Sequence, residues 1–192
     1  MQPDSQAGLA VIVDAETNEA FQRIYAGLPG DEVIHSTGGL SPFRKDNADA
    51  VIIDRSMARR SVIADVERYL AIRPQPIVVF VEKDPDSLAR EVVRSGASAF
   101  VVDGSAPARI RPVVEIAIER FLIQKSLQDE LDRTRENLAA RKLIEQAKGI
   151  LMSRRNLTED EAYRSLRAIA MKQGKPIKDV AASLLTSLDL WP

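Results

Sequence analysis

The amino-acid sequence predicts a doubly wound α/β domain with a five-stranded parallel sheet, followed by a long helix and a small all-α bundle. The first observation is five short runs rich in Val and Ile, apolar almost throughout, which is typical of parallel strands covered on both faces. The second is a set of helix start and stop signals between these runs. The third is the segment 107–140, which contains no glycine and is dominated by helix formers.

The α/β prediction covers the first part of the chain, where strand and helix patterns alternate as βα units. Thr17 precedes the first helical segment and Ser56 precedes the second. Asp84 opens the third, which Gly96 follows. The predicted strands are residues 9–14, 32–37, 49–54, 76–81 and 99–103.

Composition excludes several classes of function. The 192 residues are 45% hydrophobic and 29% charged, which is too apolar for a disordered protein. There is no cysteine and a single histidine, His35, so disulfides, thiol catalysis and Cys/His zinc sites are excluded and no cofactor is expected. No apolar run approaches the roughly 18 residues of a membrane span, and no signal-peptide pattern opens the chain. We therefore expect a cytoplasmic protein that is not an enzyme.

The balanced total charge hides an asymmetry along the chain. The whole sequence carries 27 Lys and Arg against 28 Asp and Glu, but residues 141–192 carry 10 against 6, and residues 141–178 carry 10 against 4. A local basic excess is typical of a polyanion-binding surface, although a solvated helical surface has the same composition. The charge pattern therefore places any nucleic-acid site near the C-terminal end.

The long helical segment carries a partial heptad. Ile110, Ala117, Leu131 and Leu138 fall at seven-residue spacing, although Gln124 interrupts the series. The first part of the helix is expected to pack on the α/β domain, whereas the leucines of the later part predict a two-stranded coiled coil and hence a homodimer. The predicted divisions are 1–122 for the α/β domain, 123–140 for the coiled-coil linker and 141–192 for the bundle.

Three helices are predicted after residue 140, with matching caps. Thr158 and Glu161 form a capping box at the start of the second helix, Gly174 follows it, and Pro176 suits the first turn of the third. Each helix has one apolar face, so the three form a small bundle. These faces contain Leu143, Ala147, Ile150 and Leu151; Ala162, Leu166, Ile169 and Ala170; and Ile177, Val180, Ala181, Leu184, Leu185 and Leu188.

The polar faces of the first two bundle helices are basic. At 100° per residue, members of each group fall on one side of their helix, away from the apolar stripe. Arginine neutralises phosphate and stacks on bases, and a tyrosine ring offers a stacking surface, which suits unpaired RNA bases. A tyrosine at a helix margin also suits the boundary of a core. The groups are Arg141, Lys148 and Arg155 on the first helix, and Tyr163, Arg164 and Arg167 on the second.

The bundle segment also carries a series of sequence blocks in a fixed order. These are IEQAKGILM from Ile144, EAYRSLR from Glu161, the AM pair at Ala170 and DVA from Asp179. Over 141–185 the chain resembles the ANTAR domain, the RNA-binding module of AmiR- and NasR-type antitermination regulators. The resemblance implies RNA contacts at the AKG motif and on the second helix, and leaves open which of Arg154, Arg155, Lys175 and Lys178 face the RNA. The expected RNA-binding residues are Arg141, Lys148, Gly149, Arg155, Tyr163, Arg164, Arg167 and Lys172.

The ends of the predicted strands carry a second pattern. The residues that end strands one, three, four and five are Asp14 with Ala15, Asp54, Val81 and Asp103. Over about residues 8–122 the chain resembles a response-regulator receiver domain, in which an acidic pair, a phosphoacceptor aspartate, a hydroxyl and a lysine take these positions. Phosphoryl transfer needs a bound Mg²⁺ and groups that stabilise the transferred phosphoryl. The resemblance therefore implies a pseudo-receiver used for partner binding, with Asp54 as an unused phosphoacceptor equivalent.

The two resemblances together imply a function. The segment from Ser98 through Phe121 further resembles NasT-type regulators of nitrate and nitrite assimilation. This implies binding to leader RNA with two hairpins, which prevents termination, and control by a nitrate-sensing (NasS-like) partner protein. The competing interpretations are a phosphorylation-controlled or DNA-binding response regulator and a pure interaction scaffold. The third bundle helix lacks the polar recognition face expected of a DNA reader, and a scaffold leaves the basic segment unexplained.

Overall fold

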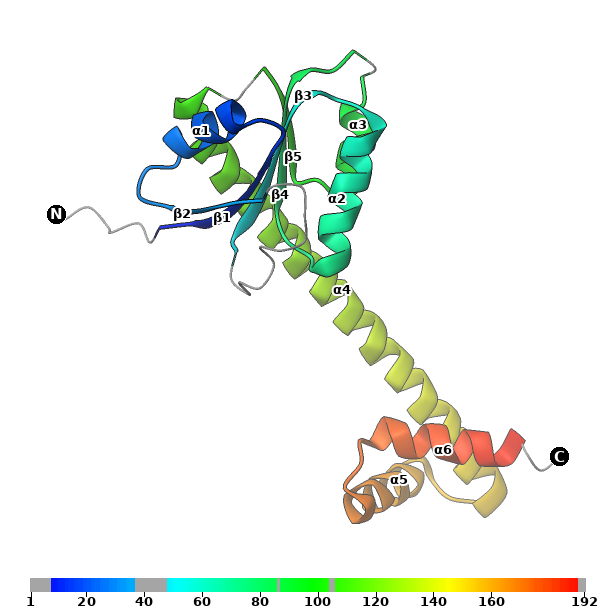
Figure 1. Ribbon diagram of the computed structural model, residues 1–192. Helices are drawn as coiled ribbons and strands as arrows, with labels where there is room; N and C mark the ends of the chain where they lie inside the picture. The colour runs from blue at the N-terminus through cyan, green and yellow to red at the C-terminus, as the bar shows by residue number, and fades with distance from the viewer. Residues whose placement is uncertain (1–7, 37–47, 86, 104–105, 190–192) are drawn as a thin grey trace. The chain divides into compact units, whose positions relative to one another are not determined.

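The computed structural model describes residues 8–36, 48–85, 87–103 and 106–189, and the chain divides into two compact units, residues 1–125 and 126–192. The first unit contains a parallel sheet with the strand order β2-β1-β3-β4-β5 (Figure 1). This confirms the predicted five-stranded doubly wound fold. The strands are β1 (Ala10–Ala15), β2 (Glu32–His35), β3 (Ala50–Met57), β4 (Ile77–Lys83) and β5 (Ala99–Val102).

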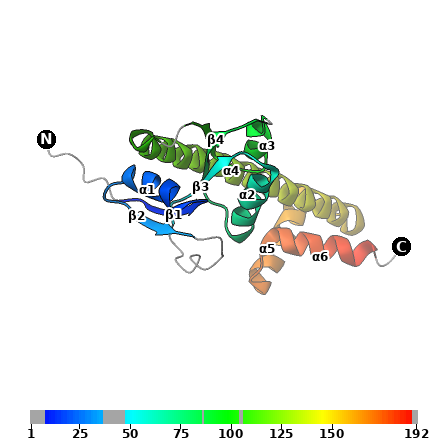
Figure 2. The same cartoon turned by 45° about the horizontal axis from the view of Figure 1, so that its top comes forward.

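Helices cover both faces of the sheet, so the first unit has three layers (Figure 2). One face packs against α2 and α3, and the other packs against α1 and the first part of α4. The nearly continuous apolar strands are explained by this double burial. The helices of the chain are α1 (Asn18–Ala26), α2 (Arg60–Ile72), α3 (Ala89–Arg94), α4 (Pro107–Arg155), α5 (Glu159–Gln173) and α6 (Ile177–Asp189).

Alternate residues of each strand point to opposite faces of the sheet and pack into two separate hydrophobic cores. Val51 and Val79 face α2 and α3, where Val66 packs against them. Ile52 and Phe80 face the other side, together with residues of α1 and α4. This α4 packing confirms that the helix begins on its own α/β domain, because Ile110, Val114 and Ala117 are fully buried there.

The predicted helix starts in the first unit are confirmed in part. Thr17 caps α1, since its Oγ1 accepts a hydrogen bond from the Ala20 N–H at 3.1 Å. The prediction that Asp84 opens the third helix is wrong, because α3 begins only at Ala89; the Asp84 carboxylate still accepts hydrogen bonds from the Leu88 and Ala89 N–H groups just ahead of it.

The prediction for Ser56 is wrong, because β3 continues past the predicted end at Asp54 and Ser56 lies within the strand. Pairing of Met57 with Lys83 extends the parallel ladder there, and α2 begins only at Arg60. Thr37, the predicted end of the second strand, lies outside the described residues.

The second unit contains the end of α4 with α5 and α6, which form the predicted three-helix bundle. The capping box is present: Glu161 N–H donates to Thr158 Oγ1, and the Glu161 carboxylate accepts from the Thr158 N–H at 2.9 Å. Gly174 ends α5 with φ 61°, a left-handed conformation that glycine adopts without a Cβ clash. Pro176 directly precedes α6 instead of lying in its first turn.

The bundle core is made of small and branched apolar side chains. Ala147 of α4 and Ala162 of α5 are fully buried members of this core. Ile169 was predicted for the apolar face but is exposed, because it lies at the margin of α5. The side chain of Leu188 lies outside the described residues. The buried members are Ala147, Leu151, Ala162, Leu166, Ala170, Val180 and Ala181.

The later part of α4 carries exposed apolar side chains. Leu127, Leu131 and Leu138 all belong to the predicted coiled-coil segment and are exposed. The predicted linker is thus a continuous helix, while its pairing with a second chain stays a prediction. None of the helices in the described part of the chain combines the length and apolar character needed to cross a membrane.

Candidate nucleic-acid interface

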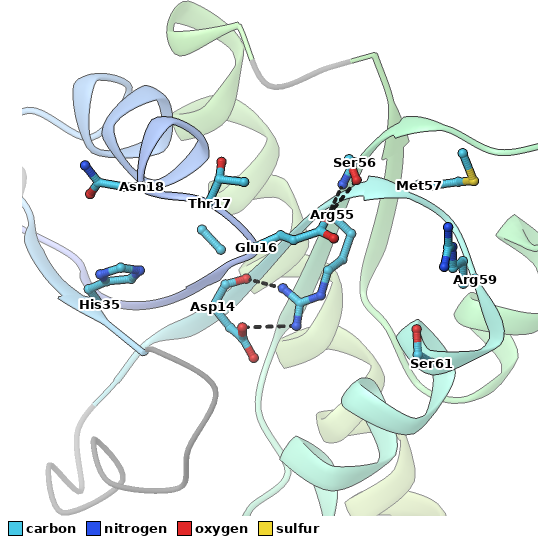
Figure 3. Close-up of a pocket in the computed structure, with 11 residues that line it drawn as sticks. Asp14, Glu16, Thr17, Asn18, His35, Arg55, Ser56, Met57, Arg59 and Ser61 are labelled. Carbon is cyan, nitrogen blue, oxygen red and sulfur yellow. Dashed lines mark hydrogen bonds and ion pairs between the residues drawn. The ribbon is translucent and has the colours of Figure 1, made fainter.

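The carboxyl edge of the sheet is organised by an arginine. Asp14 at the end of β1 is buried, and its carboxylate accepts hydrogen bonds from Arg55 at 3.0 Å and from the Tyr69 hydroxyl at 2.7 Å. Arg68 lies 3.3 Å from the same carboxylate. The Arg55 guanidinium also donates to the backbone oxygen of Asp14 (Figure 3). It further donates to the backbone oxygen of Asp54 and to the Asp65 carboxylate.

The backbone oxygen of Asp54, the predicted phosphoacceptor equivalent, belongs to this network, whereas its carboxylate faces Arg23. Asp54 is buried within β3, and its nearest cation is Arg23 of α1, with Nη2 at 3.8 Å from Oδ2. Burial raises the pKa of Asp54 from 3.8 to about 6, against the opposing effect of Arg23. Arg23 also approaches Glu82 at 3.5 Å, so its charge is shared.

The residues at this edge do not fit the Mg²⁺ that receiver domains use. The second acid of the pair is Ala15, and the remaining carboxylate, Asp14, is already engaged by Arg55, Arg68 and Tyr69. Asp103 directly follows β5 as an exposed acid with φ 50°, at the position where the receiver resemblance implies a lysine. In the described ranges no group of three acidic or histidine side chains is arranged to hold a metal ion.

A hollow of about 680 Å³ opens between β1 and β3 at this edge (Figure 3). Open α/β sheets bind ligands where the strand order reverses, which is the β1/β3 position of this sheet. Its two acids are occupied, because Asp14 holds Arg55 and the Glu16 carboxylate accepts from the Ser56 N–H and hydroxyl at 2.7 Å each. The hollow therefore offers little free negative charge.

The second unit presents the predicted basic side chains of α5 to solvent. Tyr163, Arg164 and Arg167 are exposed on one side of the helix, and we call them the basic row. Tyr163 is 43% exposed, which excludes a fully buried core role for the ring. Apart from a weak bond from Arg164 Nε to the Asp160 carbonyl at 3.3 Å, no ion pair or hydrogen bond of these three side chains is present in the described structure.

Lys148 differs from the predicted free basic face. Its side chain is buried and its ammonium contacts Glu159 at 2.6 Å and Glu145 at 2.9 Å. Hydrogen bonds to Glu159 and then Glu145 raise the pKa of Lys148, and the same bond lowers the pKa of Glu159, so the pair is charged at neutral pH. The helical wheel places Lys148 on a polar side of α4, but it cannot show that Glu159 of α5 covers this side.

The other predicted basic residues do not join the basic row. Arg155 lines a hollow of about 240 Å³ with Ser165 and Ile169, on a different side of α5. Lys172 is exposed nine residues after Tyr163, which places it on the opposite side of the helix at 100° per residue. Arg141 is exposed about two turns before Lys148 on α4.

Gly149 has no packing reason to be glycine. It lies within α4, is exposed, and a Cβ built on it meets no atom within 4 Å. A glycine inside a helix is less stable than alanine by roughly 0.5–1 kcal/mol. Bare backbone here leaves room for the close approach of a ligand.

Three comparisons place the chain among known proteins. Residues 132–185 match the ANTAR domain. Over 140 residues the chain is 32% identical to the transcriptional regulatory protein PdtaR of Mycobacterium tuberculosis, which covers 73% of this chain and 68% of that protein. The chain belongs to the ANTAR-domain family of regulators.

Two further likenesses support the architecture of this ANTAR regulator. It is 36% identical over 67 residues to the nitrate regulatory protein of Klebsiella oxytoca, which is 35% of this chain and 17% of that protein. The solved structure of the response regulator StyR shares the fold, with a TM-score of 0.53 and 14% identity over 94% of this chain and all of that one. PdtaR and the relative from Klebsiella oxytoca are both named as regulatory proteins.

Sequence reasoning missed the partners of the buried charges in this ANTAR protein. Arg55 and Arg23 were not singled out, although they supply the cations beside Asp14 and Asp54. The Arg55 position could have been suspected, since it directly follows Asp54, the predicted end of a buried strand. Nothing in the sequence indicates that Arg23 of α1 reaches this edge.

The raised pKa of Asp54 predicts a pH-dependent stability difference. Between pH 4 and pH 6 the folded protein keeps a proton that the unfolded chain has lost, so Asp54 makes unfolding easier as the pH rises. Asp54→Asn cannot ionise, and its stability relative to the wild type should increase over this range by up to about 3 kcal/mol and then level off. Urea unfolding of both proteins at several pH values measures this, and the exposed Asp129→Asn serves as control. A difference between Asp54→Asn and wild type that does not change with pH contradicts it.

Proposed function

We propose that this protein is an RNA-binding transcription antiterminator, which binds two hairpins in a leader transcript and so prevents termination. The observation that carries the proposal is the basic row, exposed on the side of the bundle where Lys148 joins Glu159. Gly149 adjoins Lys148 in α4 and provides bare backbone beside it. The ANTAR match covers all of these residues.

The chemistry of the basic row suits the unpaired bases of hairpin loops. The Tyr163 ring offers a face on which a splayed base can stack, and Arg164 and Arg167 supply charge and planar guanidinium groups. We assign Arg141, Arg155 and Lys172 to outer phosphate contacts, because they are exposed but lie away from the row. With base stacking at the centre and phosphate contacts around it, RNA affinity should depend strongly on salt concentration.

We also propose control by a nitrate-sensing partner, with target genes in nitrate and nitrite assimilation. The relative from Klebsiella oxytoca is named a nitrate regulatory protein, which supports this input. The sheet edge does not fit Mg²⁺, so a signal other than phosphorylation is needed. Exposed Leu127, Leu131 and Leu138 suit a homodimer through α4, which the partner can block.

Arginine and tyrosine variants of the basic row should weaken RNA binding with different signatures. Arg167→Ala removes a phosphate contact, so the slope of log affinity against log salt should decrease by about 0.7–0.9. Tyr163→Ala should lose about 1–3 kcal/mol of stacking with the slope unchanged. Gel shifts on the two-hairpin leader of a nitrate assimilation operon, at several salt concentrations, measure both.

The matched control is Arg90→Ala, an exposed arginine of the first unit, which should bind like the wild type. Duplex DNA of the leader sequence distinguishes an RNA reader from a DNA reader. Wild-type binding to the duplex that equals binding to the RNA would falsify the proposal.

Gly149→Ala should have opposite effects on stability and on binding. The fold should gain about 0.5–1 kcal/mol, because alanine favours the helix and its Cβ has open space. RNA affinity should fall by about 1–3 kcal/mol, since the methyl group fills space that the ligand needs. Thermal unfolding and gel shifts are compared with Ser126→Ala, an exposed helical position on α4. Equal or tighter RNA binding by Gly149→Ala removes this residue from the interface.

The sensor partner is tested by its response to nitrate. Size-exclusion chromatography with light scattering on the protein alone, with the sensor, and with sensor plus nitrate should show a complex that nitrate dissociates. A ligand shifts such an equilibrium only if it binds one state better than the other. A sensor that binds regardless of nitrate, or never binds, contradicts the proposed input.

A further inference from the structure

Lys148 belongs to the ANTAR sequence motif, yet its ammonium is not available to a ligand. It is 7% exposed, and all its donors are occupied: Nζ donates to Glu159 Oε1 at 2.6 Å and to the two oxygens of Glu145 at 3.0 and 2.9 Å. A lysine ammonium has three donors in total. A phosphate could reach Nζ only by displacing two carboxylates.

The charges around the ammonium also oppose a phosphate. The side chains of Glu145 and Glu159 are 54% and 68% exposed, so the surface above the buried Lys148 is acidic. The hydrogen bond from Lys148 lowers the pKa of Glu159, which keeps that carboxylate ionised near neutral pH. An incoming phosphate would meet these two negative groups before it met the lysine.

The Lys148–Glu159 ion pair joins α4 to α5, the helix that carries the basic row. Glu159 is the first residue of α5, and Tyr163 and Arg167 follow it at four-residue steps on the same side of the helix. Next to Lys148 in α4 and near Glu159 in α5, Ala147 and Ala162 are buried in the bundle core, where their methyl groups can make only non-directional contacts. The ion pair is therefore a directional contact that fixes the first turn of α5 against α4.

We infer that Lys148 is a positioning residue for RNA recognition, and that it acts through Glu159 to hold the basic row beside Gly149. This inference rests on the proposed RNA binding, and it replaces the phosphate contact that the motif first suggested for Lys148. The lysine positions these side chains without contacting the RNA, whereas Arg164, Arg167 and Tyr163 contact it directly.

The test compares two acidic residues of the same helix turn. Glu159 and Asp160 both lie in the first turn of α5, so alanine at either position removes one negative charge near the same helix end. Asp160→Ala should bind the two-hairpin leader RNA slightly more tightly, because a charge that repels phosphate is lost. Glu159→Ala should bind about three- to tenfold more weakly, as expected when a modest coupling between contacting residues is lost. If Lys148 contacts phosphate instead, Glu159→Ala frees it and tightens binding.

Lys148→Met gives the second measurement. Its affinity should fall without a change in the slope against salt, whereas loss of a phosphate contact would reduce the slope by about 0.7–0.9. In a double-mutant cycle, Lys148→Met should add little to Glu159→Ala, because both remove the same contact. Circular dichroism confirms that each variant is folded at the temperature of binding, so unchanged affinity in folded variants would leave the pair a purely structural contact and overturn the inference.

The outcomes separate the inference from the proposed function. A wild-type protein that does not bind the leader RNA overturns both. A wild-type protein that binds, together with a Glu159→Ala variant that binds more tightly, overturns only the positioning role of Lys148.

Discussion

The guanidinium of Arg55 holds the carboxyl edge of the sheet together, and much of the first unit depends on it. It joins the backbones of β1 and β3 to Asp65 of α2 while neutralising the buried Asp14. Removing one partner of such a buried pair leaves a charge uncompensated, which typically costs about 3–5 kcal/mol. Because the cation comes from the chain itself, this edge is complete without a metal. The receiver-like sheet is therefore held together at this edge by side chains of the chain itself.

The bundle uses a buried cation in a comparable way. Lys148 is enclosed by two carboxylates at the junction of α4 and α5, whereas Arg164 and Arg167 remain exposed. The basic excess of the C-terminal segment therefore has two parts. One part organises the helices, and the other is free for a polyanion. A count of charges cannot separate them, because the distinction lies in which side chains meet across the helix interface.

Features that depend on neighbouring residues could be predicted from the sequence, whereas contacts between residues far apart in the chain could not. Strands, the Thr17 cap, the Thr158 capping box and Gly174 depend on neighbouring residues, and the structure contains each of them. The ANTAR domain was predicted from its sequence blocks and is matched over residues 132–185. The pairs Arg55–Asp14 and Arg23–Asp54 join residues far apart in the chain, so no local pattern predicts them. A helical wheel placed Lys148 on a polar side, but it could not show that Glu159 of another helix covers it.

The order of strands in the sheet has a consequence for how the chain folds. β1 comes first in the chain but pairs with β3, so the pairing of Val11 with Ala50 at the centre of the sheet requires the chain between them to close into a loop. Parallel pairing over such separations is slow, because the entropy of loop closure is lost before the strand contacts that offset this loss have formed. The helices of the bundle contact segments close in sequence, and such local topologies fold quickly. We expect the bundle to form early once its residues are available, with closure of the sheet as the slower kinetic phase.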